Sequence, residues 1–208
     1  MRTLIAVAAT LLVLTGCELV FTTSPLAFLQ RDPSKLSAEQ QITYAQNALA
    51  SGDRDAMAKA FQALKGSSDP AVQLLAVDLA VGAAGVEGAL IGLIADLGVD
   101  GVDETAALDA AIASFSAADL ALIAEAATLL DAADDSLTPT PEQYVFVAVG
   151  LLAIAAEASG GVAALDGSTA EQQQAEAFLQ LAYDLLQESG SSTDLIEGLG
   201  DAFGFAPS

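Results

Sequence analysis

The sequence contains no histidine and no tryptophan, and its single cysteine is Cys17. Without histidine the chain cannot assemble a histidine-assisted serine or cysteine triad, and typical zinc sites lose a common ligand. Without a second cysteine it cannot form an intramolecular disulfide. We therefore expect a protein that is not an enzyme, that has no catalytic residues and no cofactor, and whose stability depends on helix packing.

Basic side chains are also scarce, and none occurs after Lys65. The chain has 6 Lys and Arg residues against 28 Asp and Glu residues, a formal net charge of −22. Residues 66–208 hold 23 of the acidic residues and no basic one, so that part alone carries −23. This charge repels phosphate backbones and anionic lipid headgroups, and we expect no nucleic-acid partner. A saline habitat, a basic partner or bound cations would each account for it.

Long apolar runs are missing beyond the amino-terminal segment. The longest, Val145 to Ala156, spans 12 residues, whereas a transmembrane helix needs about 20. The apolar stretch from Leu74 to Leu97 is interrupted by acidic residues and several glycines. The pattern therefore predicts that Val145–Ala156 forms a buried core helix.

The first residues have the layout of an export signal. One positive charge, Arg2, precedes a short apolar stretch over residues 4–13, which is too short to be a permanent span. The stretch leads to Leu14-Thr15-Gly16-Cys17, which resembles the lipobox of bacterial lipoproteins. The resemblance implies that residues 1–16 are a signal peptide, that the Cys17 sulfur receives a diacylglycerol and that the new amino terminus is acylated. The alternatives are an ordinary signal peptide with an incidental cysteine, or a buried amino-terminal helix.

Lipid on Cys17 would anchor the chain to a membrane of the cell envelope. Glu18 follows the cysteine, where the best-known inner-membrane retention signal has aspartate, so the resemblance favours the outer membrane over the inner one. Residues 17–36 show no sustained periodicity and predict a lipidated tether. Residues 37–208 then form an acidic all-helical domain.

Helix-capping residues occur at intervals along the rest of the chain. No run shows the alternation of apolar and polar residues that is typical of a half-buried strand. Capping boxes stand at Ser37-Ala38-Glu39-Gln40 and Thr140-Pro141-Glu142-Gln143, and Ser116-Ala117-Ala118-Asp119 is a further cap. The fold class is therefore all-α. The predicted helices cover 37–51, 53–64, 70 to the glycine-rich break at 82–88, that break to 97, 103 or 105 to 115, 116–133, 140–159, 168–188 and 193–204.

Short connections between these helices predict antiparallel pairs. The segments that begin at Gln40, Gln143 and Ala177 are separated by 103 and 34 residues, close to whole multiples of the roughly 34-residue tetratricopeptide period. Ala58, Phe61 and the later Pro70 resemble part of one tetratricopeptide unit, and the segment from Asp69 to Ala76 also resembles the start of a HEAT-type helix. The architecture is expected to be a tetratricopeptide-like α-solenoid or an irregular helical bundle.

Carboxylates are the reactive groups that remain, and two clusters of them are candidate cation sites. Calcium prefers such oxygen ligands, but neither cluster has the spacing of a helix-loop-helix calcium loop, and aspartate is common at helix ends for capping alone. The first cluster consists of Asp96, Asp100, Asp103 and Glu104, and the second of Asp131, Asp134 and Asp135.

Together these features predict a non-enzymatic binding or scaffold protein tethered to the envelope membrane. Helical pairs would present a grooved surface to another envelope protein or a peptide. The alternative is a periplasmic small-ligand carrier or transporter accessory, in which Ala- and Leu-lined helices surround an apolar cavity. Tyr44, Tyr144 and Tyr183 fall within predicted amphipathic helices, which favours packing in or beside the core over a binding role.

Overall fold

The computed structural model describes residues 32–97, 102–132 and 138–205, and the regular structure in these ranges is helical without a strand. The predicted all-α class is confirmed. The 3-10 helix η2 (Pro33–Lys35) comes first, and a second one, η3 (Val162–Ala164), lies between α8 and α9. The α-helices are α2 (Ala38–Ser51), α3 (Arg54–Leu64), α4 (Pro70–Ala84), α5 (Val86–Leu97), α6 (Glu104–Ala113), α7 (Ala117–Asp131), α8 (Pro141–Ser159), α9 (Ala170–Ser189) and α10 (Asp194–Phe203).

The predicted caps explain where the helices begin. At the start of α8, the Thr140 amide donates to Gln143 Oε1 (2.9 Å) and the Gln143 amide donates to Thr140 Oγ1 (3.3 Å). Ser116 and Asp119 exchange the same two bonds at the start of α7. Each such cap stabilises a helix by about 1 kcal/mol, so the helix boundaries follow largely from local sequence.

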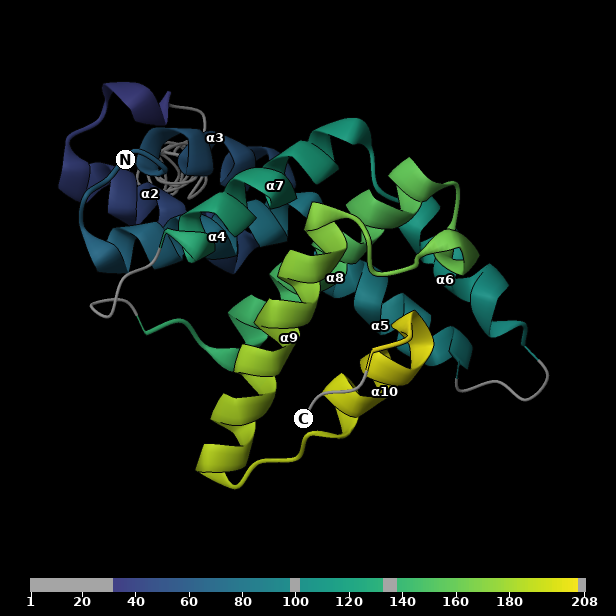
Figure 1. Ribbon diagram of the computed structural model, residues 1–208. Helices are drawn as coiled ribbons and strands as arrows, with labels where there is room; N and C mark the ends of the chain where they lie inside the picture. The colour runs from purple at the N-terminus through teal and green to yellow at the C-terminus, as the bar shows by residue number, and fades with distance from the viewer. Residues whose placement is uncertain (1–31, 98–101, 133–137, 206–208) are drawn as a thin grey trace, which may run out of the picture.

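The helices pack against one another mostly in chain order. In the row α2, α3, α4, α7, α8, α9 each helix packs on the next, and α4 also touches both α2 and α8. Stacked helix pairs of an α-solenoid have these neighbour relations. Helices α5 and α6 interrupt the row: they pack on each other and lie with α10 at the opposite end of the molecule from α2 and α3 (Figure 1). The described residues thus form a row of packed helices with an inserted helix pair, an arrangement consistent with either an irregular helical bundle or an α-solenoid.

The glycine-rich break predicted at residues 82–88 is a sharp bend at one residue. Helix α4 continues through Gly82 and ends at Gly85, whose φ is +75°. Helix α5 begins at Val86 and leaves at 54° to α4. A Cβ at position 85 would be strained by this backbone and would lie 3.1 Å from Cζ of Arg54. Glycine at this position therefore directs α5 away from the row.

Helix α8 forms the centre of the core. It contacts α4, α5, α6, α7, α9 and η3, and its Leu151 and Leu152 are fully buried. Helix α7 approaches it closely because residue 150 is glycine: an added Cβ there would lie 2.5 Å from Cγ2 of Ile123. The predicted core helix over Val145–Ala156 is therefore confirmed, within a longer helix.

Helix α8 is also apolar enough to cross a membrane, judged by length and composition alone. It has 19 residues and a mean hydropathy of 1.3, and 67% of its apolar window is buried inside the domain. Within the described residues, two bent pairs pass the same test only as broken spans: α4 with α5, and α6 with α7 at 92°. In the folded domain, neighbouring helices cover most of the α8 surface that would otherwise face lipid.

The last residues of the predicted tether pack onto the domain. Pro33 is buried and its carbonyl accepts a hydrogen bond from Gln41 Nε2 at 3.0 Å, while Leu36 packs against the core. The folded part therefore includes these residues as well as the helices that follow. Cys17, the signal peptide and the rest of the tether lie outside the described residues.

Two ion pairs join the basic helix α3 to the acidic part of the chain. Arg54 Nη2 lies 2.7 Å from Oδ1 of Asp119, and Lys65 Nζ lies 2.6 Å from Oε2 of Glu125. The first pair joins the two helix starts and the second lies further along both helices, so α3 and α7 run in the same direction. Two of the few basic residues of the chain thus pair with carboxylates in the strongly acidic part, residues 66–208.

Candidate functional site

The described members of the first acidic cluster predicted as a cation site lie at helix ends. Asp103 is the N-cap of α6 and accepts a hydrogen bond from the Ala106 amide at 3.2 Å. Glu104 begins the same helix, Asp96 is exposed near the end of α5, and Asp100 lies outside the described residues. Among the described residues, no group of three or more Asp, Glu, Cys or His side chains is placed to hold a metal ion. Capping accounts for Asp103 without a cation.

The second acidic cluster is mostly beyond the described ranges. Asp131 is the last residue of α7 and is exposed, while Asp134 and Asp135 lie outside the described residues. Calcium binding at either cluster therefore stays a prediction.

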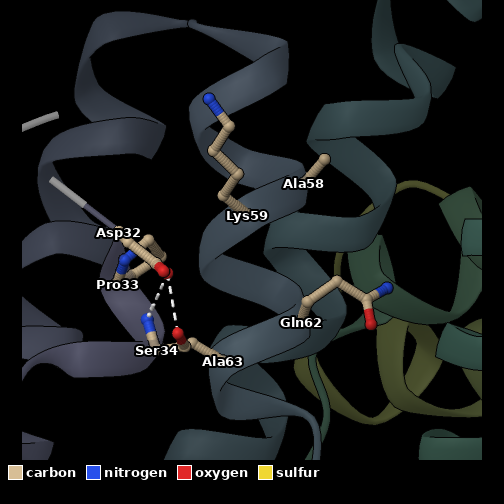
Figure 2. Close-up of a pocket in the computed structure, with 7 residues that line it drawn as sticks. All are labelled: Asp32, Pro33, Ser34, Ala58, Lys59, Gln62 and Ala63. Atoms are coloured by element: carbon tan, nitrogen blue, oxygen red, sulfur yellow. Dashed lines mark hydrogen bonds between the residues drawn. The ribbon is translucent and has the colours of Figure 1, made fainter. Parts of the chain in front are cut away.

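A hollow of about 510 Å³ lies between η2 and α3, and Figure 2 shows the side chains that line it. Asp32 supplies its only lining carboxylate, and that group already accepts hydrogen bonds from the Ser34 amide (3.1 Å) and hydroxyl (2.7 Å). These bonds hold the pKa of Asp32 below its ordinary value. In the figure the Lys59 ammonium extends away from this carboxylate. The hollow therefore lacks converging polar groups that would orient a ligand.

A second hollow, of about 430 Å³, lies where α3, α4, α5 and α8 meet, and Arg54 lines it. The Arg54 guanidinium donates to the carbonyls of Ala83 (2.6 Å) and Ala84 (2.8 Å) at the end of α4, in addition to its ion pair with Asp119. A cation at a helix carboxyl end satisfies carbonyls that have no partner within the helix. Burial alone raises the pKa of Asp119, but hydrogen bonds from Ser116 and the charge of Arg54 lower it overall. Arg54 is thus occupied in joining three helices.

Asp78 is the half-buried carboxylate of this second hollow. Its Oδ1 accepts a hydrogen bond from Gln143 Nε2 at 2.7 Å, and the same amide group reaches the carbonyl of Leu74 at 3.4 Å. Burial raises the pKa of Asp78, and the bond from Gln143 only partly offsets this. The folded state therefore holds a proton on Asp78 more tightly than the unfolded state does.

Asp78→Asn is expected to stabilise the protein at neutral pH. A raised carboxyl pKa means that the charged form costs stability above the folded-state pKa, and that this cost disappears as the pH falls toward the unfolded value. Asparagine keeps an acceptor for Gln143 and removes the charge. We expect Tm at pH 7 to rise by roughly 2–4 °C, the shift that about 1 kcal/mol produces in a domain of this size. The rise should shrink at acidic pH, as measured by thermal unfolding followed by circular dichroism.

Glu157→Gln serves as the control for the loss of one negative charge, because Glu157 is exposed on α8. A control variant that reproduces both the size and the pH dependence of the Asp78→Asn effect would show that net charge, and not burial, is responsible.

A mainly apolar opening lies between α5 and α10, and we call it the α5–α10 groove. Its volume is about 300 Å³. The two helices lie side by side in Figure 1. Its lining is apolar except for one carboxylate and consists of Leu90, Leu93, Ile94, Asp194, Leu195, Gly198, Leu199 and Ala202.

Large apolar side chains remain exposed along this groove. Ile94 is 51% exposed and Leu195 is 44% exposed, and Ile91, one turn before Ile94 on α5, is 59% exposed. Together with Val102 and Leu181 they make up the exposed large hydrophobic residues of the described chain. Three of these five therefore belong to the two helices that form the groove.

Acidic side chains border the groove on α10. Asp194, Glu197 and Asp201 are exposed and recur at helical spacing, so they form one stripe beside the apolar stripe of Leu195 and Leu199. The ion pairs within the described residues use Asp32, Asp119 and Glu125, so none of them neutralises α5 or α10. The groove is thus apolar inside and negatively charged along its edge.

The interior between the same helices is filled. The hollow enclosed by α5, α6, α8 and α10 has a volume of about 20 Å³, which is about the room that one water molecule occupies. A carrier of a lipid or an organic acid would need a much larger space at this position. The accessible apolar surface here is the open groove.

No family model matches this chain, and no curated protein and no solved structure is significantly similar to it.

Proposed function

We propose that this chain is a bacterial lipoprotein, anchored in the cell envelope by lipid on Cys17, whose helical domain binds a partner protein through the α5–α10 groove. The outer membrane is the favoured location, because Glu18 follows the lipidated cysteine. The domain acts as a binding or scaffold module and not as an enzyme. The observation that carries the proposal is the exposure of Ile94 and Leu195 in one groove, with Ile91 exposed one turn before Ile94 on α5.

Burial of such an apolar surface by a partner contributes a favourable free energy of about 25 cal/mol per Å². Contiguous apolar patches rimmed by polar residues mark interaction surfaces more often than they mark solvent-facing surface. The groove also lies at the end of the molecule away from η2, which is the described element nearest in sequence to the proposed anchor. The alternative, a small-ligand carrier, is supported less, because the neighbouring interior is filled.

Leu195→Asp is expected to reduce partner binding by at least about tenfold, because it places an uncompensated carboxylate in an apolar contact. Leu181→Asp is the matched control: both leucines are 44% exposed, but Leu181 does not line the groove. A photo-reactive benzophenone side chain at Ile91, in the full chain in its own envelope, would report binding as the yield of one cross-linked adduct of defined mass. Leu181→Asp should leave this yield within about twofold.

Both variants should keep their helical content and Tm, because neither leucine is buried. Equal losses of the adduct in the two variants, or no loss in either, would contradict the placement of the binding surface in the groove.

A further inference from the structure

The shape of the α5–α10 groove suits a helix as its occupant. The lining extends from Asp194 to Ala202 on α10, which corresponds to about 12 Å at 1.5 Å per residue, and from Leu90 to Ile94 on α5. A partner helix of about two to three turns therefore covers the groove. Helix-in-groove recognition uses apolar anchors spaced three and four residues apart.

The floor of the groove leaves room for close approach. Gly198 lines it, and a Cβ added to Gly198 would meet no atom within 4 Å. Ala202, one turn further along α10, is also small and lines the same groove. The large side chains Ile94 and Leu195 flank these small residues, so the groove offers a recess between two apolar edges.

The charge around the recess determines which charge the partner should carry. A helix that lies on Leu195 and Leu199 places its own flanking residues beside the acidic stripe of Asp194, Glu197 and Asp201. No Lys or Arg exists after Lys65, and α3, which carries two of the described cations and is followed directly by Lys65, lies at the other end of the molecule (Figure 1). Among the described residues, the acids therefore have no counter-charge, and they favour a cationic neighbour.

These observations also disfavour a second copy of the chain as the occupant. Two copies joined groove to groove would bring their acidic stripes together, and each copy carries a net charge of −22. Like charges placed face to face across an interface oppose association.

We infer that the α5–α10 groove binds an amphipathic helix that is apolar on one face and rich in Lys or Arg on its flanks. The inference rests on the proposed function and specifies the chemistry of the partner. Apolar anchors of that helix fill the recess at Gly198, and its basic residues lie against the α10 carboxylates. The acidic composition of the chain thereby contributes to recognition.

The test uses three labelled peptides of about 14 residues, near four helical turns. The first carries Leu at helical spacing with flanking Lys, the second has the same Leu positions with Glu in place of Lys, and the third is a scrambled form of the first. Each is titrated with the full lipidated chain in neutral phosphatidylcholine vesicles, with empty vesicles as background. Fluorescence anisotropy measures Kd.

We expect the Lys peptide to bind at least about tenfold more tightly than either of the others. Raising the salt from roughly 50 to 500 mM should weaken it by about fivefold or more, because rim charges are screened. Leu195→Asp and Gly198→Leu should each weaken it at least about tenfold, whereas Leu181→Asp should leave Kd within about twofold. Gly198→Leu fills the recess at a position with open space, so it separates a blocked groove from a misfolded domain.

If Leu195→Asp and Gly198→Leu leave the Kd of the Lys peptide unchanged, the peptide binds elsewhere on the acidic surface and the inference is wrong. Absence of binding, or self-association of the chain that Leu195→Asp abolishes, would overturn it as well. Equal binding of the Glu peptide, sensitive to the groove variants, would reject the basic partner while the groove remained the binding surface. Failure of the proposed function itself would appear separately, as a cross-linked adduct that Leu195→Asp does not reduce.

Discussion

Replacing Cys17 by serine is expected to abolish lipid attachment completely. A serine hydroxyl does not form the thioether that the lipobox resemblance assigns to the cysteine, and the sequence has no other cysteine to take its place. Metabolic labelling with an alkyne-bearing fatty acid should label the wild-type chain and leave Cys17→Ser at background. The intact mass of the wild-type protein should lack residues 1–16 and include the added acyl chains.

Glu18→Ser is the matched control, because it alters the neighbouring residue and keeps the thiol. It should be labelled as strongly as the wild type. More than one acyl chain gives a stable membrane anchor, whereas a single chain gives only marginal binding, so the number of chains in the intact mass also reports how firmly the protein is held. Persistent label on Cys17→Ser, or an unlabelled wild-type chain that retains residues 1–16, would refute the lipoprotein assignment.

Gly150→Val is expected to destabilise the domain by about 3 kcal/mol. The first added carbon alone would lie 2.5 Å from Cγ2 and 2.7 Å from Cδ1 of Ile123, and overpacking of a well-packed core costs roughly 1–3 kcal/mol or more. The better helix propensity of valine recovers only a few tenths of a kcal/mol. Urea unfolding followed by circular dichroism would measure the loss.

Shortening Ile123 should relieve this clash. Ile123→Ala alone removes a fully buried side chain and should cost about 2–5 kcal/mol. The double variant should be at least about 1 kcal/mol more stable than the sum of the two single losses predicts, because the new valine fills the space that isoleucine leaves. Additive losses would show that residues 123 and 150 do not share one packing space.

Local signals in the sequence were sufficient to predict most of the helices. Thr140 with Gln143 and Ser116 with Asp119 form the expected caps, because a cap depends on residues within one helical turn. Tyr44 is fully buried and Tyr144 packs against Phe178 with ring centroids 5.5 Å apart, as the core interpretation of the tyrosines predicted. These features require no knowledge of how distant segments meet.

Features that join distant segments were not predictable in the same way. Arg54 reaches Asp119 across 65 positions of sequence, and no local pattern indicates that pairing. The sequence places the bend only within residues 82–88, because any of the glycines in that range could allow it. The structure places it at Gly85. The fold therefore depends on a few long-range contacts that the helix pattern leaves undetermined.

The candidate groove was missed for a related reason. Ile91 and Ile94 belong to a helix that is apolar on several sides, so sequence alone does not distinguish its buried face from its exposed one. Helix α10 carries a clearer signal, because Leu195 and Leu199 alternate with Asp194 and Glu197 at helical spacing. That amphipathic pattern predicts a helix with one covered face, but not that part of the face stays open beside α5.

The composition of α8 also bears on the proposed export of the chain across a membrane. Under the proposed function the chain is exported across a membrane, and a segment of 19 residues with a mean hydropathy of 1.3 is close to the length and apolarity at which a helix partitions into the bilayer. Glu142 and Glu157, near its two ends, oppose that partitioning. Four of its eleven buried residues are alanine, and larger apolar residues at these positions would favour retention in lipid. These small side chains therefore suit the proposed export as well as close helix packing.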